Sequence, residues 1–444
     1  MRRCSKLLLG LWLAGVGPLA FGMDLSDAYQ AALVHDATLN AARAAADAGR
    51  ESVPQARAQL FPNVSLSYSR NNVQLETSTP NALGQVAGSS YGYPSRNDSA
   101  VVRQPIYRRG LWAQYKQALA QQGEVEASLD GELQNLGVKV AGAYFDALLA
   151  LDHLALIRSQ AATLRTQLDA ARKMFAGGAG TRTDIDETQA RLDMNTAQEL
   201  EAAQNVELTR QQLQSLTNQP MDALAALNPK KLDLHPPLPD DVKEWVRRAE
   251  EASPEMRTHR SRLATATLEI DKAQAGHLPT LDAVAQWSRS MSENTQAIES
   301  GNATRSLGLQ LTIPVFSGGS VNSAVRQALA SKTRAEQLLE GGRRDVALKV
   351  FREYRGVTEG ILRVKALEQA VRSAEQALVS ANRSFLAGSR TRLDVLNAES
   401  ARMLAMRDLG QSRYLYLLSH LRLKALVNET NAQTIDAMNA WFQE

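Results

Sequence analysis

One phrase that occurs twice constrains the fold of this chain most. Phe175-Ala-Gly-Gly-Ala-Gly-Thr-Arg-Thr-Asp-Ile185 returns in the second half as Phe385-Leu-Ala-Gly-Ser-Arg-Thr-Arg-Leu-Asp-Val395. The equivalent positions are Phe175 and Phe385, Gly178 and Gly388, Thr181 and Thr391, Arg182 and Arg392, and Asp184 and Asp394. A repeat with so long a period indicates a tandem duplication with two structural halves, and excludes a solenoid of short units.

Each copy of the phrase has the residues of a tight turn between two helices. Gly388 can adopt the left-handed conformation that ends a helix. Thr391, with Asp394 three positions later, has the capping-box spacing that starts the next helix. The first copy has the same three residue types at the same spacing. The phrase therefore predicts the tip of a helical hairpin in each half.

Heptad patterns lead into both turns. The first series steps by three and four from Leu133 to Phe175, and the second runs from Val350 to Phe385 with one shortened step before Leu367. The first series consists of Leu133, Leu136, Val140, Ala143, Ala147, Ala150, Leu154, Ile157, Ala161, Leu164, Leu168, Ala171 and Phe175. These patterns predict coiled-coil helices, and a helix from Tyr107 to Phe175 would be about 100 Å long at ~1.5 Å per residue.

The segments before the hairpins alternate with a period of two instead. Val64, Leu66 and Tyr68 are separated by serines, as expected for a strand with one apolar face. The alternation predicts strands at about 63–75, 97–106, 280–290 and 304–315, with polar loops at about 76–97 and 288–305 between the members of each pair. The prolines at the four strand–helix junctions are Pro62, Pro105, Pro279 and Pro314.

Four strands cannot close a membrane barrel, which needs at least about eight. An open sheet edge is not tolerated in hydrocarbon, so chains that span a membrane with these strands must pool them. The alternative to membrane-spanning strands is that the four strands form two ordinary β-hairpins on a soluble domain. It is disfavoured because an isolated hairpin is marginal in water and no third element follows that could cover the strands.

The first 22 residues have the pattern of a secretory signal peptide. Arg2, Arg3 and Lys6 precede an apolar run that ends near Phe21, and this run is short for a membrane anchor. Their removal lowers the formal net charge from +3 to zero, which argues against nucleic acid as a partner. The one cysteine, Cys4, lies in this segment, so the mature chain is expected to have no disulfide and no thiolate metal site.

Four motifs resemble those of the TolC-like outer-membrane factors. They are Ala143-Tyr144-Phe145, Gly276-His-Leu-Pro-Thr-Leu-Asp282, Pro314-Val-Phe-Ser-Gly-Gly319 and Gly388-Ser-Arg-Thr-Arg-Leu-Asp-Val-Leu396, and the resemblance covers about residues 25–428. It implies a mainly α fold with a small β part and two tandem repeats. Coiled-coil hairpins would form a long α-helical barrel, continuous with a transmembrane β-barrel that the protomers share.

The resemblance also implies a function and partners. The chain would be a homotrimer with twelve pooled strands in the outer membrane of a Gram-negative bacterium, with a long periplasmic portion. It would export proteins or small molecules together with a periplasmic adaptor (membrane fusion) protein and an inner-membrane ABC or RND transporter, in contact with outer-membrane lipid. The alternative is a periplasmic coiled-coil adaptor or tether without a pore, which has no need of two matched strand hairpins.

The expected organisation follows the repeats. It comprises a signal peptide at 1–22, a first repeat at 23–217 with its hairpin at about 107–217, a proline-rich equatorial connector at 218–255, a second repeat at 256–428 with its hairpin at about 320–428, and a C-terminal tail at 429–444. The tail has no functional interpretation from sequence alone.

Two interpretations of the tip acids remain open. Asp184 and Asp394 can be helix-start acids that complete capping boxes. The resemblance instead implies a periplasmic gate, in which Asp394 is a ring acid, Asn397 takes the place of a second ring acid, and Arg390, Asp184 and Phe385 take the linking positions. Asn397 and Phe385 depart from the family pattern of an acid and a tyrosine.

The sequence contains no pattern that predicts catalysis. The six histidines have no metal-ligand spacing, and no HExxH, GxSxG, P-loop or dinucleotide fingerprint occurs. We therefore expect no enzyme activity, no metal and no cofactor, and the energy for transport must come from a partner.

Overall fold

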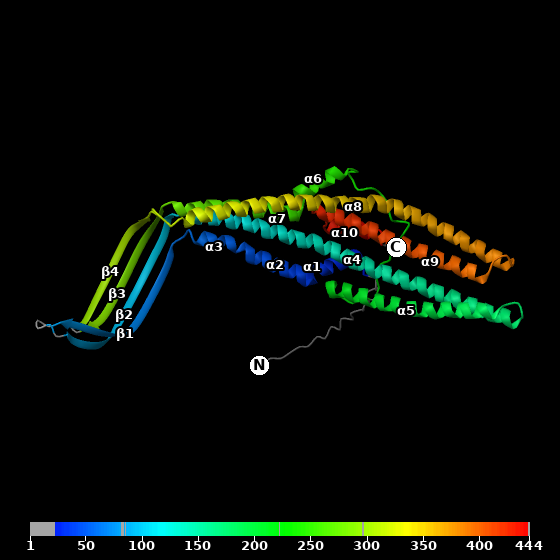
Figure 1. Cartoon of the computed structure of the whole chain (residues 1–444), viewed down its shortest axis with the longest axis horizontal. Helices are drawn as coiled ribbons and strands as arrows, with labels where there is room; N and C mark the ends of the chain where they lie inside the picture. Colours follow the sequence, from blue (N-terminus) through cyan, green and yellow to red (C-terminus); the bar gives the residue numbers. More distant parts are fainter. Residues whose placement is uncertain (1–22, 81–83, 85, 222, 295–296, 443–444) are drawn as a thin grey trace, which may run out of the picture.

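The computed structural model describes residues 23–80, 84, 86–221, 223–294 and 297–442. The predicted signal peptide lies outside the described residues. Figure 1 shows an elongated molecule, with a curved sheet at one end and the tips of two long helical hairpins at the other.

The two halves repeat one order of elements. The first half contains α1 (Leu25–His35), α2 (Ala37–Arg50), α3 (Ser52–Ala58), β1 (Asn63–Pro80), β2 (Val86–Tyr107), α4 (Arg109–Ala176) and α5 (Arg182–Thr217). The second contains α6 (Val242–Ala252), α7 (Pro254–Gln274), η1 (Ala275–His277), β3 (Thr280–Asn294), β4 (Ala297–Thr312), α8 (Ser320–Leu386), α9 (Arg392–Leu426) and α10 (Ala432–Asn439). The prediction of a mainly α, tandemly repeated chain is confirmed.

The strands form one antiparallel sheet in the order β1-β2-β3-β4. They are longer than predicted, because most of the expected loops at 76–97 and 288–305 continue the ladders. Those segments are polar on both faces, so they lack the alternation that reveals a half-buried strand. β4 ends at Thr312, before the predicted end at 315, because Thr312 pairs with Thr280, where its partner strand β3 begins.

The register gathers apolar residues of all four strands on one face, although Val73, Val101 and Val284 lie on the other. The row Val64–Val102–Ala285–Leu307 crosses the whole sheet. Leu66, in the next row on this face, is 80% exposed, and Leu307 is 85% exposed. The opposite face consists mainly of serine, threonine, asparagine and glutamine. We call these the outer and inner faces of the sheet, since an apolar face belongs to lipid and a polar face to a lumen.

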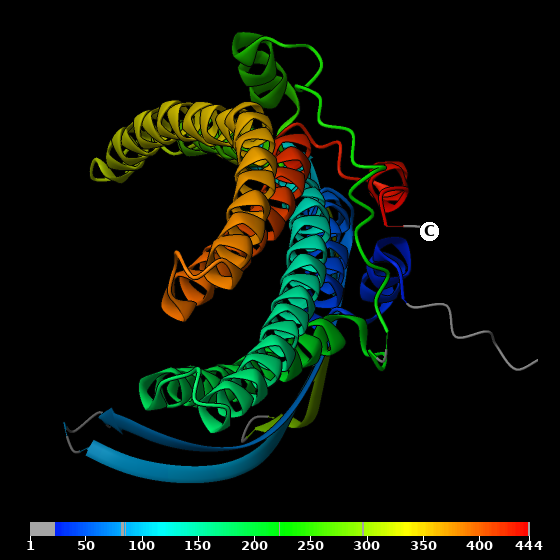
Figure 2. The same ribbon diagram turned by 90° about the vertical axis from the view of Figure 1, so that its right-hand side faces the viewer.

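Helix α4, 68 residues long, is the central element of the helical part. Toward the sheet it packs against α2, α3 and α7, and toward the tip it pairs with α5. Helices α8 and α9 form the second hairpin, and α9 also contacts α4. Figure 2 shows the two hairpins side by side in a curved wall.

The heptad predictions largely hold. Ten members of the first series, from Leu136 to Ala171, have buried side chains, while Leu133 and Ala143 are half-buried. Phe175 is wrong as a buried member, because it is 45% exposed at the tip, where α4 ends and its neighbours turn away. In the second series, Val350, Val357 and Val364 are fully buried.

A core at the middle of the molecule joins both chain ends to the helices. The hydroxyl of Tyr144 donates to the carbonyl oxygens of Met23 and Ala225, each at 3.0 Å. The backbone N–H of Leu25 donates to the side-chain oxygen of Asn439 at 3.1 Å. Ile435 is fully buried in the same core. The tail at 429–444, which the sequence left without a role, therefore contributes α10 to this core.

Helix α4 also contains a window that is apolar enough to cross a membrane by length and composition. Half of that window is buried inside the protein. A core helix with many alanines and leucines passes the same test, so we interpret the window as part of the coiled-coil core.

We predict that Leu154→Asp destabilises the protein strongly. Leu154 is 7% exposed between α4 and α5, and a buried, unpaired carboxylate there costs about 3–5 kcal/mol. Thermal unfolding should show a clear fall in Tm. Ala155→Asp is the control, because Ala155 is exposed in the protomer. Equal tolerance of both changes would contradict the assignment of the buried face.

Candidate functional site: the hairpin tips

The turns at the two hairpin tips have the same backbone conformation. Gly178 and Gly388 have φ values of 74° and 77°, the left-handed conformation that the sequence predicted for them. In each turn the glycine N–H donates to the carbonyl oxygen three residues earlier, on Phe175 or Phe385, at 3.0 Å. A residue with a β-carbon would be strained at either position.

Each return helix begins with a complete capping box. The Thr181 hydroxyl accepts from the Asp184 N–H, and the Thr181 N–H and hydroxyl donate to the Asp184 carboxylate. Thr391 and Asp394 repeat this arrangement, with the Thr391 N–H 2.9 Å from the carboxylate. The capping interpretation of both acids is therefore confirmed.

The cap also changes the acidity of one acid. The Thr391 hydroxyl and N–H stabilise the ionised carboxylate of Asp394, and these two bonds, with a smaller contribution from the charge of Arg390, lower its pKa below the usual range. Asp394 is thus an anion throughout the physiological range. Its carboxylate is engaged at its own helix start and still carries a full negative charge at the tip.

The other predicted gate residues lie around the second tip. Asn397, one turn after Asp394, accepts a hydrogen bond from Arg191 of α5 at 2.9 Å. Phe385 is half-buried under the guanidinium of Arg392, which lies 4.8 Å from the ring centre. The same guanidinium approaches the sulfur of Met174 at 3.7 Å. Two contacts thus connect the hairpins near their tips, Arg191 to Asn397 and Arg392 to Met174.

Sequence reasoning missed Arg191 and Met174 and did not assign Arg392 a contact. Arg191 lies seven residues after Asp184, so the two share one face of α5, which is the signal that could have found it. Within the protomer, no hydrogen bond or ion pair between Arg390 and Asp184 occurs among the described residues, and the Asp184 carboxylate binds Thr181 of its own turn.

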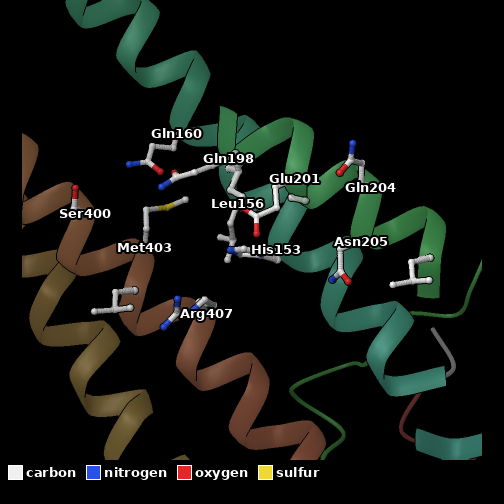
Figure 3. Close-up of a pocket in the computed structure, with 14 residues that line it drawn as sticks. His153, Leu156, Gln160, Gln198, Glu201, Gln204, Asn205, Ser400, Met403 and Arg407 are labelled. Carbon is white, nitrogen blue, oxygen red and sulfur yellow. The ribbon is translucent and has the colours of Figure 1, made fainter. Parts of the chain in front are cut away.

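A groove separates the return helices α5 and α9 behind the tips. It has a volume of about 860 Å³ and is lined by α4, α5 and α9. Figure 3 shows His153 of α4, Glu201 of α5 and Arg407 of α9 around it. Burial, with a smaller effect of the Arg407 charge, lowers the pKa of His153, so this imidazole is neutral at pH 7. The hairpins therefore contact through α4 and at the tips, with open space between the return helices.

The four predicted prolines lie at the junction of sheet and helices. Pro62 and Pro279 directly precede β1 and β3, Pro105 is near the end of β2 at a register shift, and Pro314 follows β4. An ion pair crosses this junction. The guanidinium of Arg108, which is half-buried, binds both carboxylate oxygens of Asp282, which is 4% exposed. It connects the first residue before α4 to the second half of the chain.

Comparison with known proteins agrees with this architecture. The profile of the family described as "Outer membrane efflux protein" matches residues 28–219 and 245–429, one match in each half. The chain belongs to this family. Its relatives include the "Proteases secretion protein PrtF" of Dickeya chrysanthemi, 31% identical over 100% of this chain and 96% of that protein. The "Alkaline protease secretion protein AprF" of Pseudomonas aeruginosa is 31% identical over 100% and 92%. The "Outer membrane protein TolC" of Escherichia coli is 29% identical over 99% and 89%.

Solved structures share the fold. An outer membrane protein of Vibrio cholerae, VceC, superposes with a TM-score of 0.76 at 19% identity, over 91% of this chain and 96% of that chain. A membrane protein from Pseudomonas aeruginosa gives a TM-score of 0.78 over 97% and 98%, also at 19% identity. This family member is therefore an outer-membrane channel with a helical periplasmic tunnel, and not the adaptor or tether that the sequence left as an alternative.

We predict that the cap at α9 weakens in acid. Because the folded pKa of Asp394 is lowered, its contribution to helix stability is complete above the ordinary pKa of aspartate and is lost as the pH falls through the folded pKa. Hydrogen exchange of the first turn of α9, corrected for intrinsic rates, should show protection that declines across this range. Thr391→Ala should reduce the protection already at neutral pH. An unchanged exchange rate in that variant would show that the cap does not stabilise the turn.

Proposed function

We propose that the chain forms a homotrimeric export duct, which carries proteins across the outer membrane and is gated at its hairpin tips. The observation that carries this proposal is the sheet: four strands with one continuous apolar face and with both edges, β1 and β4, unpaired among the described residues. The duct itself performs no enzymatic step. Transport is driven by an inner-membrane transporter of the ABC or RND type through a periplasmic adaptor.

The number of chains in the barrel follows from the number of strands that each chain contributes and from the family resemblance. Edges that carry free N–H and C=O groups must pair with neighbouring chains in the hydrocarbon region. Two chains give eight strands and three give twelve, and both can close a barrel. The family resemblance supports three. In the trimer, outer-membrane lipid would contact the outer face of the sheet.

We predict that the purified protein is a trimer in mild detergent. Light scattering should give a protein mass three times that of the mature chain, and unboiled samples should migrate as an SDS-resistant oligomer. A monodisperse monomer that remains inserted in outer-membrane fractions would contradict the pooled barrel.

Protein cargo is supported by the relatives. PrtF and AprF, which are named for protease secretion, are matched along all of this chain and at higher identity than the TolC of Escherichia coli. A duct that ends in a barrel with a hydroxyl- and amide-rich inner face offers little to bind an unfolded chain tightly. Such a surface suits passage of a polypeptide of varied sequence.

The gate rests on the few contacts at the tips. The groove keeps α5 and α9 apart over much of their length, and Arg191–Asn397 and Arg392–Met174 connect the hairpins near the narrow end. In a trimer, three copies of Asp394 would surround one axis there, with Asn397 one turn on and with Arg390, Asp184 and Phe385 nearby. Opening would require loss of these contacts and outward movement of one hairpin.

We predict that Arg191→Ala increases single-channel conductance in planar bilayers by several-fold, because it removes the hydrogen bond that connects α5 to Asn397. Arg182→Ala is the matched control. Arg182 is an arginine at the same tip, but it pairs with Asp186 on its own helix. If both variants conduct like the unmodified protein, Arg191 does not hold the tips together. Arg390→Ser should also raise conductance if that residue links neighbouring protomers.

The same bilayers test the ring acid. Asp394→Ala should lower cation selectivity, since it removes the charge, whereas Thr391→Ala removes the cap and leaves the charge. Equal effects of the two variants would show that Asp394 acts only as a helix cap.

A further inference from the structure

The inner face of the sheet is almost free of charge. In a strand, side chains point alternately to the two faces, so the register assigns each residue to one of them. Cross-strand partners on the inner face form rows that run around the barrel wall. The row nearest the helices is Pro105–Asp282–Gln310, and the next is Asn63–Arg103–Val284–Gly308. A row farther from the helices is Ser69–Asn97–Ser290–Asn302. Within these rows, Arg103 and Asp282 are the charged residues.

The two charges differ in their surroundings. Asp282 is 4% exposed, and its carboxylate is held by both guanidinium nitrogens of Arg108 that face it. That pair is neutral as a unit. Arg103 is exposed and, within the part of the chain that the structure describes, its guanidinium donates no hydrogen bond, although its charge adds to that of Arg108 near Asp282. One uncompensated positive charge per chain therefore remains on the inner face, one row from the helical junction.

We propose that Arg103 forms a cationic ring at the inner mouth of the barrel and that this ring favours anionic cargo, such as acidic segments of an exported polypeptide. The inference rests on the proposed pooled barrel, in which three copies of Arg103 lie at one level of the lumen. Serine, threonine and amide side chains surround the ring and contribute no opposing charge. Charges of one sign in a confined, low-dielectric wall reinforce each other's potential.

The ring acts independently of the acids at the tips. The 68 residues of α4 separate the two ends by about 100 Å at ~1.5 Å per residue, more than ten times the Debye length of ~8 Å in physiological salt. A cation-selective entrance at the tips and an anion-favouring ring at the inner mouth of the barrel can therefore coexist. The ring must be tested with a local probe, because the narrow tips would dominate the selectivity of the whole channel.

The probe is a reporter cysteine on the inner face, in a Cys4→Ser background that has no other cysteine. Ser65→Cys is nearly isosteric and lies on β1, diagonally across from Arg103. Its modification rates are measured from the barrel side with 2-sulfonatoethyl methanethiosulfonate, an anion, and with 2-(trimethylammonium)ethyl methanethiosulfonate, a cation. The ratio of the two rates reports the local potential. Ser69→Cys, on the same face about 13 Å farther along at ~3.3 Å per residue, reports its decay.

We expect the anionic reagent to be favoured at Ser65→Cys, and Arg103→Gln to lower the anion-to-cation rate ratio about fivefold at physiological salt. Arg103→Lys should retain the ratio, and the effect at Ser69→Cys should be smaller. Arg305→Gln is the matched control, since Arg305 faces Trp287 on the outer face of the sheet.

An unchanged ratio in Arg103→Gln, or an equal change in Arg305→Gln, would overturn the inference. If the oligomer and its conductance are intact in that case, the proposed duct still stands and only the ring is wrong. If the protein forms neither an oligomer nor a pore, the proposed function fails and the ring fails with it.

Discussion

The two unpaired edges of the sheet are the constraint on which the rest of the structure depends. In hydrocarbon a four-stranded sheet cannot leave the backbone groups of β1 and β4 unpaired, and in water its apolar face would stay exposed. Association of several chains removes the edges and at the same time encloses a lumen. The helices must then surround the same axis as the barrel. Their length and their curved arrangement in Figure 2 suit a wall that continues the lumen away from the membrane.

The helical part is densely packed at the middle of the molecule and less densely packed toward the hairpin tips. At the middle, Tyr144, the start of α1 and the tail helix α10 share one buried core, which fixes both chain ends to α4. Toward the tips, each hairpin buries only a narrow strip of side chains between its own two helices, and a groove separates the return helices. Local stability follows the density of buried apolar contacts, so the tips are the part that can move at least cost.

The sequence predicted those features that local chemistry determines. Glycine at a left-handed position and Thr-x-x-Asp at a helix start are encoded within a few residues, and both tips adopt the predicted geometry. The sequence predicted the parts of the strands next to the helices and missed the parts within 76–97 and 288–305. These segments are largely polar on both faces, and their pairing depends on partners elsewhere in the chain. The contacts of Arg191 and Arg392 join segments about 200 residues apart, and a periodic pattern in one helix cannot show which helix lies opposite.

The junction between sheet and helices explains how one chain can have a movable tip and a fixed pore. Prolines interrupt the backbone at each strand–helix connection, and Arg108 and Asp282 hold the two halves together where the strands end. Asp282 is 4% exposed, so loss of Arg108 would leave a carboxylate without its partner, and the pair therefore opposes separation of the junction. Displacement of a hairpin at its far end can therefore be absorbed by bending along some 100 Å of helix. In the proposed duct, the barrel end would keep its strand register while the entrance at the tips opens.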